Sequence, residues 1–315
     1  MEQTQAAAMT DLSIVIFSSR DPAATVLQAI EHALIAAGSY SYQLHLFFNG
    51  DEQRAKTLTD LIRQHYPQES VQVWFFALAD KANCMNLYWH QVKPAARMHF
   101  FVDGYVRLQP DSFSQLIKAH HTSKAHAFTG IPANGRSSAK LRRQMLSTGG
   151  IHGNLYMLPE ACLQQLRAVQ FYLPLGIYRT DPTMAALLCF DFQPQSQPWQ
   201  PEKIQVVAAA GWQFEQLRWY KLKDLKADLL RKKRQAQGYI ENKAVRQLFA
   251  IEQQAAAALP EFATDLCLHY LQQHPLSWRE YLRNPLLYFA IKDLKQRQSQ
   301  QAKLAGLKSA YWKFK

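Results

Sequence analysis

The first part of the chain alternates between short apolar runs and stretches whose apolar residues recur at helical spacing. Residues 12–17 form a nearly continuous apolar run, which is typical of a strand buried on both faces. A polar break follows at residues 18–22, and apolar residues then recur every three or four positions across 23–37, up to Gly38. The pattern therefore predicts a buried strand followed by a helix that packs against it.

The same alternation repeats over the next hundred residues. Further strands are expected at 42–48, 71–77 and 98–102, and further helices at 54–65, at 83–92 and from about 112 onward. Strands that alternate with helices of about ten to fifteen residues indicate βαβ units and a parallel sheet. The expected fold class is therefore α/β.

Beyond residue 125 the predicted elements become shorter and less regular. The pattern indicates strands at 127–132, 155–158 and 204–210, and helices at 159–169 and 183–189. Residues 134–143 are polar and basic and are expected to form a loop that enters a helix. Residues 147–154 are rich in glycine, which lets the backbone come close to a ligand or to another segment.

The tail from about residue 211 onward has a helical pattern and a different character. Residues 218–246 contain ten Lys or Arg and three acidic residues, and four leucines form an apolar stripe through this run (222, 225, 229 and 230). Two interpretations are open. The run is either a solvated helix packed by its leucines or a face that meets a membrane surface or phosphate groups.

Charge and composition narrow the range of partners. The chain has 315 residues, 48% of them hydrophobic, which suffices for a large core. Its net charge of +12 favours anionic partners, namely nucleotide phosphates, a lipid surface or nucleic acid. Nucleic acid is not expected, because the basic cluster 231–234 lacks interleaved aromatic residues and any recognisable binding motif.

The cysteines and the apolar runs bear on the compartment. Four cysteines, at positions 84, 162, 189 and 267, lie far apart and show no paired spacing, which argues against a zinc site and a disulfide framework. Residues 1–10 do not resemble a signal peptide, and no apolar run approaches the roughly 18–20 residues needed to span a bilayer. We therefore expect a cytoplasmic protein that is soluble or peripheral to the membrane.

Polar residues with chemical potential follow several of the predicted strands. Asp103 ends the strand at 98–102, and an acid at the end of a buried strand is costly unless something pairs with it. Residues 49–51 end another strand, the polar segment 80–83 follows a third, and Asp181 stands before a helix. Ligands collect at the carboxyl ends of strands in α/β sheets, so a site is expected there. The alternative for Asp103 is a surface turn.

The order of these signals resembles that of the family 2 glycosyltransferases, over roughly residues 11–218. The resemblance implies a GT-A fold, with a mixed, mostly parallel sheet flanked by helices and a helical extension. It also implies an inverting enzyme that moves a sugar from a nucleotide-diphosphate donor, expected to be a UDP-sugar, to a glycan or lipid-linked acceptor in cell-surface polysaccharide synthesis.

The resemblance also implies a division of the chain. A disordered segment is expected at 1–10, the catalytic domain at 11–215 and a basic helical region at 216–315. The basic region would hold the enzyme at an anionic membrane surface on the cytoplasmic side.

The resemblance further assigns roles to single residues. The residues expected to bind the nucleotide sugar are Ser18, Ser19, Arg20, Asn49, Asp51, Lys81, Asn86, Asp103, Gly104 and Tyr105. The residues expected to hold the acceptor and the sugar are Gly149, Gly150 and His152, and Arg218 and Trp219 stand where processive synthases have Gln-x-x-Arg-Trp. In the turn at 49–51, Phe48 replaces the acid that contacts the base in the family.

The segment 103–105 matches the Asp-x-Asp motif, whose two carboxylates hold the ribose and a Mg²⁺ or Mn²⁺ ion. Tyr105 replaces the second acid, although hard cations prefer charged oxygen ligands. Asp103 could bind the metal through water, with help from a distant group such as His152 or Asp111. Alternatively, basic side chains such as Lys81 neutralise the diphosphate without metal. In the third interpretation the protein is a catalytically inactive scaffold that serves as a binding or assembly module.

Asp181 matches the catalytic base of the family. An acceptor hydroxyl must lose a proton as it attacks the anomeric carbon, and a carboxylate held nearby can take that proton. One base without a covalent intermediate gives inversion. The alternative for Asp181 is a helix N-cap before Pro182, and the two roles are compatible.

Overall fold

The computed structural model describes residues 9–133, 138–214 and 222–314. Its strands are β1 (Thr10–Ser18), β2 (Tyr42–Asn49), β3 (Val71–Phe76), β4 (Ala96–Asp103), β5 (Val106–Leu108), β6 (Ala127–Pro132), β7 (Leu155–Pro159), β8 (Ile204–Phe214) and β9 (Tyr311–Lys313). The α-helices are α1 (Ala23–Ala37), α2 (Glu52–His65), α3 (Lys81–Leu87), α4 (Ser112–His121), α5 (Ser138–Thr148), α6 (Glu160–Ala168), α7 (Thr180–Cys189), α8 (Leu222–Arg246), α9 (Ala263–Gln273), α10 (Trp278–Arg283), α11 (Leu286–Gln298) and α12 (Gln301–Leu307).

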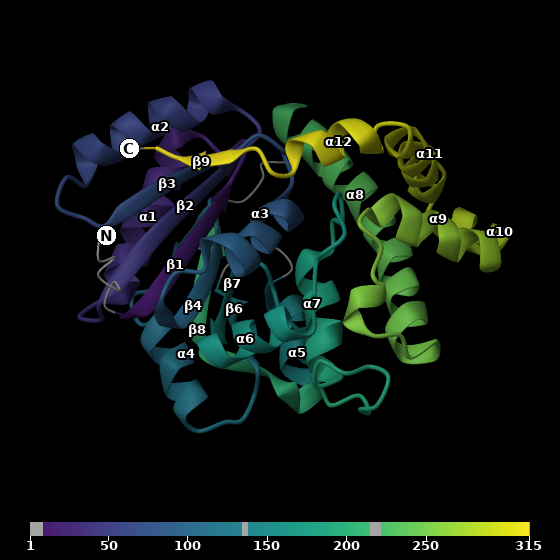
Figure 1. The fold of residues 1–315 in the computed structure, drawn as a ribbon, viewed down its shortest axis with the longest axis horizontal. Coiled ribbons are helices and arrows are strands. Elements are labelled where there is room, and N and C mark those ends of the chain that lie inside the picture. Colours follow the sequence, from purple (N-terminus) through teal and green to yellow (C-terminus); the bar gives the residue numbers. More distant parts are fainter. Residues whose placement is uncertain (1–8, 134–137, 215–221, 315) are drawn as a thin grey trace, which may run out of the picture.

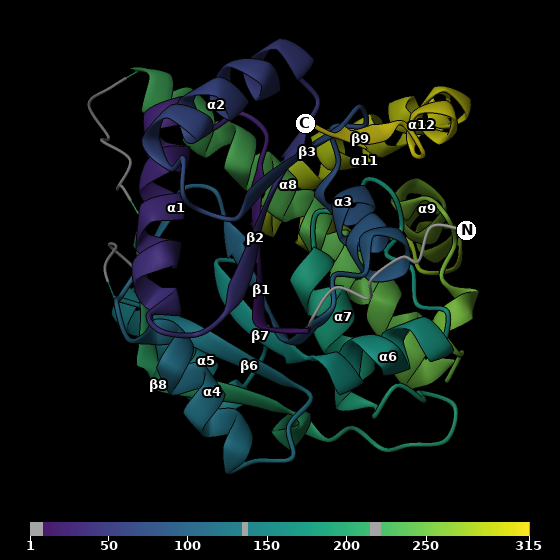
Figure 2. The same cartoon turned by 60° about the vertical axis from the view of Figure 1, so that its left-hand side comes forward.

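The described strands form one mixed sheet in the order β5-β8-β6-β7-β4-β1-β2-β3-β9. Its centre, β3-β2-β1-β4, is parallel, and β7 pairs antiparallel with β4. Helices cover both faces (Figures 1 and 2). The sheet-and-helix architecture that the alternating pattern predicts is confirmed. Strands that are apolar on both faces need cover on both faces, and the helices supply it.

Each central strand sends alternate side chains to two different cores. In β1, Leu12, Ile14 and Ile16 pack in the core beneath α1, α2 and α4. Val15 and Phe17 of the same strand pack in the core beneath α3, α6 and α7. The second core also contains apolar side chains of the C-terminal part, from α8 to α9, so that part packs directly on the sheet domain.

The tail differs from the all-helical pattern that its sequence predicts. The chain returns from α12 to the sheet, where β9 pairs antiparallel with β3 (Figure 1). The ring of Trp312 lies 4.7 Å from that of Phe75, and the ring of Tyr311 lies 5.6 Å from that of Phe76. The aromatic residues close an otherwise open sheet edge, and this long-range pairing left no periodic signal in so short a segment.

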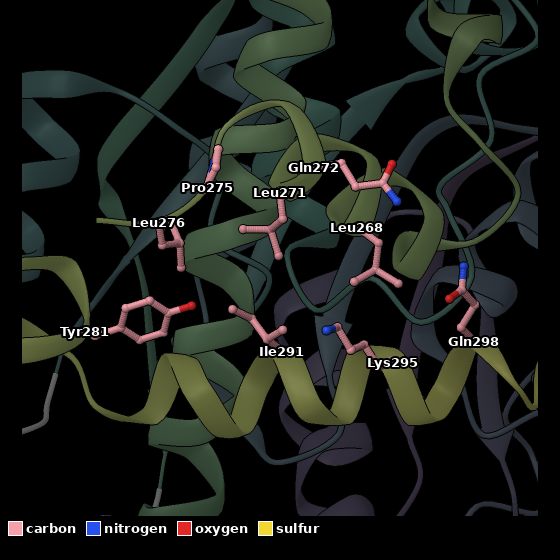
Figure 3. Close-up of a pocket in the computed structure, with 9 residues that line it drawn as sticks. All are labelled: Leu268, Leu271, Gln272, Pro275, Leu276, Tyr281, Ile291, Lys295 and Gln298. Carbon is pink, nitrogen blue, oxygen red and sulfur yellow. The ribbon is translucent and has the colours of Figure 1, made fainter. Parts of the chain in front are cut away.

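The C-terminal helices enclose a small apolar core of their own. Its buried members come from α8, α9 and α11. A groove of about 560 Å³ lies beside it (Figure 3), lined by Leu268, Leu271, Gln272, Pro275, Leu276, Tyr281, Ile291, Lys295 and Gln298. Among the described helices, none combines the length and the apolar character that crossing a bilayer requires.

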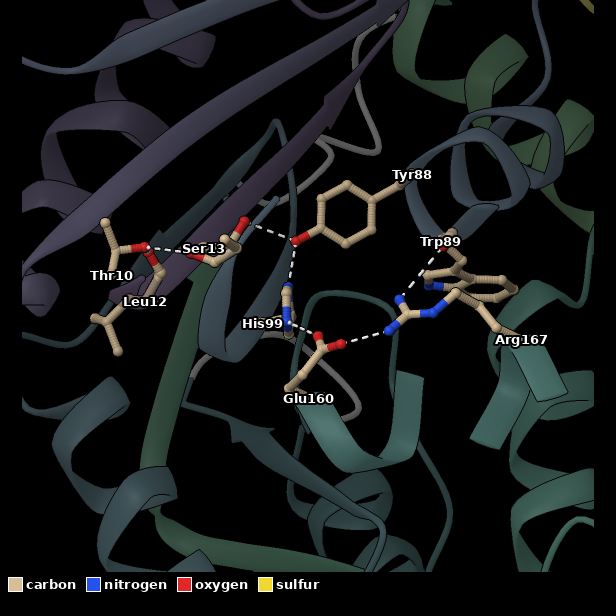
Figure 4. A network of polar contacts seen from close by, with 9 residues as sticks. Thr10, Leu12, Ser13, Tyr88, Trp89, His99, Glu160 and Arg167 are labelled. Atoms are coloured by element: carbon tan, nitrogen blue, oxygen red, sulfur yellow. Dashed lines mark hydrogen bonds and ion pairs between the residues drawn. The ribbon is translucent and has the colours of Figure 1, made fainter. Parts of the chain in front are cut away.

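A buried polar network joins β1, β4 and α6 (Figure 4). The Tyr88 hydroxyl lies 2.7 Å from Ser13 Oγ and 2.6 Å from His99 Nδ1, and His99 Nε2 lies 2.8 Å from a Glu160 oxygen. Arg167 donates to the other Glu160 oxygen. Burial raises the pKa of the Glu160 carboxyl, but the bonds from His99 and Arg167 outweigh it and hold the pKa below its usual value.

Candidate functional site

Asp103 sits at the carboxyl end of β4, directly opposite Phe17 of β1. The Gly104 N–H donates to the Phe17 carbonyl at 2.7 Å. A Cβ on Gly104 would lie 2.9 Å from that oxygen and 2.9 Å from Ser18 Cβ, closer than real Cβ atoms approach. The close contact between β1 and Gly104 therefore requires glycine, and it holds the Asp103 carboxylate beside the β1–α1 loop.

The two oxygens of the Asp103 carboxylate have different hydrogen-bond partners. Lys81 Nζ, from the first turn of α3, lies 2.6 Å from Oδ1. The Tyr105 hydroxyl lies 3.0 Å from Oδ2 and 2.9 Å from Asn154 Oδ1. The Asp103 and Lys81 side chains are 17% and 26% exposed, and Tyr105 is 40% exposed. The group is thus partly open to solvent rather than sealed in the core.

Asp181 approaches the same group from α7. A Cβ on Gly153 would lie 2.3 Å from Asp181 Oδ2, so the carboxylate packs directly against the backbone of the glycine-rich loop. The next residue of that loop, Asn154, contacts Tyr105. Asp181 Oδ1 is buried and has no hydrogen-bond partner within the described part of the chain. The two carboxylates that the sequence singles out, Asp103 and Asp181, therefore lie in one cluster.

The N-cap interpretation of Asp181 is wrong. Helix α7 begins at Thr180, three residues earlier than predicted, and its N-cap is Arg179. Asp181 thus lies within the first turn, where a negative charge is stabilised by the helix dipole. Its carboxylate is free to point toward the loop instead of binding its own helix.

Charges in the cluster shift the pKa of its members. Burial alone would lower the pKa of Lys81, but the negative charges of Asp103 and Asp181 raise it above the usual value. Burial lowers the pKa of His152 against the opposing pull of Asp181 and Asp103. Burial and the charge of Asp103 raise the pKa of Tyr105. At neutral pH the cluster therefore contains a cationic lysine, a neutral histidine and a neutral tyrosine.

The glycine-rich loop brings His152 to the carboxylates. Gly149 and Gly150 have φ values of +72° and +105°, a conformation that other residues rarely adopt. The His152 Nδ1 atom accepts from the Asn154 N–H at 3.3 Å, and its ring lies 4.8 Å from the ring of Trp212. His152 is therefore close enough to feel the charges of Asp181 and Asp103, and its expected contact with an acceptor and a sugar stays a prediction.

The β1–α1 loop contributes a carboxylate that the sequence analysis missed. Asp21 Oδ2 accepts from Ser18 Oγ at 2.8 Å. Burial raises the pKa of Asp21, and the charge of Asp103 raises it further. The sequence signal that could have identified Asp21 was its position, three residues beyond the end of a central strand. Of the other predicted loop residues, Ser19 is half-buried and Arg20 is exposed.

A second missed residue, Glu241, comes from α8. Its buried carboxylate accepts from the Tyr178 N–H and the Arg179 N–H, both at 2.9 Å, and from Gln237 Nε2 at 2.7 Å. A Cβ on Gly238 would lie 2.5 Å from Arg179 Nε. Helix α8 thus holds the segment that immediately precedes Asp181. An acid near the end of a basic helix gave no sequence signal for this role.

Three predicted nucleotide contacts have other partners in the structure. The Asn86 amide donates to the Leu173 carbonyl at 2.9 Å and accepts from its N–H at 2.8 Å, so it fixes a loop instead. Asp51 caps α2 by accepting from the Arg54 N–H at 3.0 Å. Asn49 is buried, and its amide lies 3.6 Å from Cys84 Sγ. In the structure both polar atoms of the Asn86 amide bond the Leu173 backbone, and its contact with a nucleotide stays a prediction.

Other predictions concern residues that lie elsewhere. Arg218 and Trp219 fall outside the described residues, as do residues 1–8 of the expected disordered N-terminus. Asp111 is the N-cap of α4 and makes no cap hydrogen bond through its side chain. The four cysteines are free and buried, in agreement with the absence of disulfide spacing in the sequence.

The Asp103 group offers few ligands of its own to a divalent cation. Within the described ranges, no cluster of three or more His, Cys, Asp or Glu side chains is placed to hold a metal ion. Mg²⁺ at nucleotide sites usually takes one or two carboxylates and completes its shell with water and substrate phosphates. Asp103, with Asp21 beside it, fits that mode of binding, provided that Lys81 releases Oδ1.

Comparisons with known proteins give a result at the level of the fold. No protein-family model and no curated protein sequence matches the chain. The solved mannosyltransferase PcManGT from Pyrobaculum calidifontis, in complex with GDP-Man and Mn²⁺, matches with a TM-score of 0.57 and 11% identity over 95% of this chain and 86% of that one. TarS 1–349 from S. aureus matches with a TM-score of 0.51 and 10% identity over 91% and 80%. The chain therefore has the GT-A type of fold that its sequence predicts.

Proposed function

We propose that this chain is an inverting glycosyltransferase. It would move a sugar from a nucleotide-diphosphate donor to a hydroxyl of a glycan or lipid-linked acceptor, in the synthesis of a cell-surface polysaccharide. The observation that supports the proposal is the meeting of two unlike carboxylates at one edge of the sheet. Asp103 is paired with a cation, whereas Asp181 keeps a buried oxygen without a hydrogen-bond partner among the described residues. The two carboxylates can therefore serve different partners.

The donor would lie on the Asp103 side of the cluster. Lys81 stays protonated beside Asp103, so it can neutralise the charge that develops on the departing nucleoside diphosphate. Asp103, with Asp21, would hold a Mg²⁺ or Mn²⁺ ion together with the donor phosphates, and such an ion stabilises charge on the leaving group. Ser18 places Asp21 for this role through its hydrogen bond.

The acceptor would lie on the Asp181 side. As the acceptor hydroxyl attacks the anomeric carbon, its proton passes to the Asp181 carboxylate, and the bond from that carbon to the diphosphate oxygen breaks. The neutral His152 beside Asp181 can donate a hydrogen bond that orients the acceptor. Because the proposed step uses a base and no covalent intermediate, it inverts the configuration at the anomeric carbon.

Donor binding and turnover test the proposal separately. Calorimetry with UDP, GDP and their sugars, each with and without Mn²⁺, measures binding. The sequence resemblance suggests UDP-sugars as donors. GDP-sugars are included because PcManGT was solved with GDP-Man. Asp181→Asn should leave donor binding unchanged and reduce transfer by about 10²–10⁴-fold. Transfer at the native rate would mean that the base is elsewhere. A chain that binds no nucleotide would refute the whole proposal.

The second candidate is an inactive GT-A scaffold that binds a nucleotide sugar and serves an assembly. Its support is Tyr105, whose hydroxyl takes the place of a second carboxylate and bonds Asp103 and Asn154. Metal titration of the native chain and of Tyr105→Asp, with Tyr105→Phe as the control, separates the two candidates. Donor binding without turnover under every condition would favour the scaffold.

A further inference from the structure

Two successive helices at the outer end of the C-terminal part expose large apolar side chains. On α10, Trp278 is 67% exposed and Leu282 is 69% exposed; on α11, Tyr288 is 63% exposed and Phe289 is 51% exposed. Single exposed apolar residues are ordinary, but several close together mark an interaction site. Figure 1 shows α10 at the edge of the molecule, away from the sheet. We call these residues, with the basic residues described next, the α10–α11 surface.

The acidic residues of these two helices pair with lysines of α8. Glu280 of α10 pairs with Lys243 of α8 at 2.5 Å, and this bond, with others from Ser277 and Tyr239, lowers the pKa of Glu280 to about 2. Asp293 of α11 pairs with Lys233 of α8 at 2.6 Å. Both acids are therefore neutralised by lysines of α8.

Three basic residues of the same helices are exposed and lack an acidic partner among the described residues. Arg279, Arg283 and Lys292 are exposed, and none of them pairs with a carboxylate within the described part of the chain. The Arg279 guanidinium lies 5.5 Å from the centre of the Trp278 ring. The outer side of α10 and α11 thus combines aromatic and aliphatic side chains with unpaired positive charge.

We propose that the α10–α11 surface docks onto an anionic lipid bilayer. Aromatic side chains favour the boundary between headgroups and acyl chains, and arginine and lysine favour the phosphates above it. An anionic bilayer attracts all three cations at once, and it does not require the exact geometry that a protein partner would need. A second copy of the chain is a poor occupant, because apposing two such surfaces would bring six cations together.

The structure favours this surface over the basic run of α8 that the sequence suggests. In the described part of that run, Arg231 and Lys232 both pair with Asp228, and Lys233 pairs with Asp293. Intramolecular bonds therefore already engage much of its charge. Leu229 and Leu230 are 58% and 45% exposed, so the expected packing of the helix by these two leucines is wrong.

Helix α8 connects the proposed membrane surface to the cluster around Asp181. Its Tyr239 and Lys243 bond Glu280 of α10, and Glu241, between them, holds the segment before Asp181. A bilayer bound at α10 would therefore keep a fixed orientation relative to the proposed acceptor side. Membrane docking does not depend on the proposed transfer reaction, because it is measured without a donor.

Vesicle flotation of the full chain tests the inference. The vesicles are phosphatidylcholine alone and phosphatidylcholine mixed with phosphatidylglycerol. The apolar variant combines Trp278→Ser, Leu282→Ser and Phe289→Ser, and the charge variant combines Arg279→Glu, Arg283→Glu and Lys292→Glu. Control variants change exposed residues of the same kinds elsewhere, Trp199→Ser with Ile35→Ser, and Lys118→Glu. Circular dichroism confirms that each variant is folded.

The native chain should float with the anionic vesicles and not with neutral ones. Both α10–α11 variants should lose about tenfold or more of the bound fraction, and the controls none. The inference is overturned if the native chain ignores anionic vesicles, or if the apolar variant binds as the native chain does. Loss of binding only in Lys232→Glu with Arg234→Glu would place the contact on α8 and overturn it as well. So would concentration-dependent dimerisation that the apolar variant abolishes.

Discussion

Glu241 offers a direct test of how the C-terminal part supports the candidate site. Its carboxylate accepts the backbone N–H groups of Tyr178 and Arg179, both at 2.9 Å, and lies at a position with no solvent exposure. Glu241→Ala would remove the acceptor from both groups. Asp181 follows Arg179 by two residues, so the change should also disturb the proposed catalytic base.

The structure sets the expected magnitude. A buried donor left without an acceptor costs about 1–3 kcal/mol, so the two N–H groups together cost about 2–6 kcal/mol. The lost bond from Gln237 adds little to this cost, because the Gln237 amide still donates to the Gly176 carbonyl at 3.2 Å. Glu241→Gln retains one acceptor oxygen and should lose about 1–3 kcal/mol. The control Asn242→Ala, on the exposed side of the same helix, should change nothing.

The dependence on pH has a definite sign. Burial raises the pKa of Glu241 above its usual value of 4.5, so the folded protein prefers the protonated form. The native chain therefore loses stability as pH rises from the unfolded-state pKa to the folded-state pKa. Glu241→Gln lacks this titration. The stability difference between the native chain and the glutamine variant should consequently shrink as pH increases.

Urea unfolding and transfer kinetics measure the two effects. We expect a lower free energy of unfolding and a lower kcat in both Glu241 variants, with the glutamine variant recovering part of each. Donor affinity should stay unchanged, since Lys81 and Asp103 do not touch this segment. A loss of less than about 1 kcal/mol in Glu241→Ala, or a change in donor affinity without a change in kcat, would refute the reasoning.

Two further predictions concern the glycine-rich loop and the buried network. Gly153→Ala should abolish transfer, because its Cβ would lie 2.3 Å from Asp181 Oδ2 and displace the carboxylate; Gly306→Ala, which has open space around it, should retain full activity. Glu160→Gln should lower the unfolding midpoint at neutral pH, since it weakens the bond to His99. The folded-state pKa of Glu160 is lowered, so its contribution is lost as pH falls, and the midpoints of native and variant chains should converge in acid.

The sequence alone was sufficient for the central architecture. The apolar run at 12–17 and the helical spacing at 23–37 correspond to β1 and α1, and α1 has the predicted bounds. Both features depend on the local period of apolar residues, which a short window contains. Asp103 could be singled out for a related reason, because it ends a strand and such ends gather at one edge of a parallel sheet, whereas the role of Asp181 came from the family resemblance.

The tertiary structure decided which partner each polar side chain has. Lys81 pairs with Asp103 across 22 residues, Asn86 binds Leu173 across 87, and Glu241 holds Arg179 across 62. No local pattern records such distant partners, because they depend on how the elements pack and not on the period within any one of them. For the same reason, the pairing of β9 with β3 and the exposed aromatic side of α10 and α11 became visible only in the folded chain.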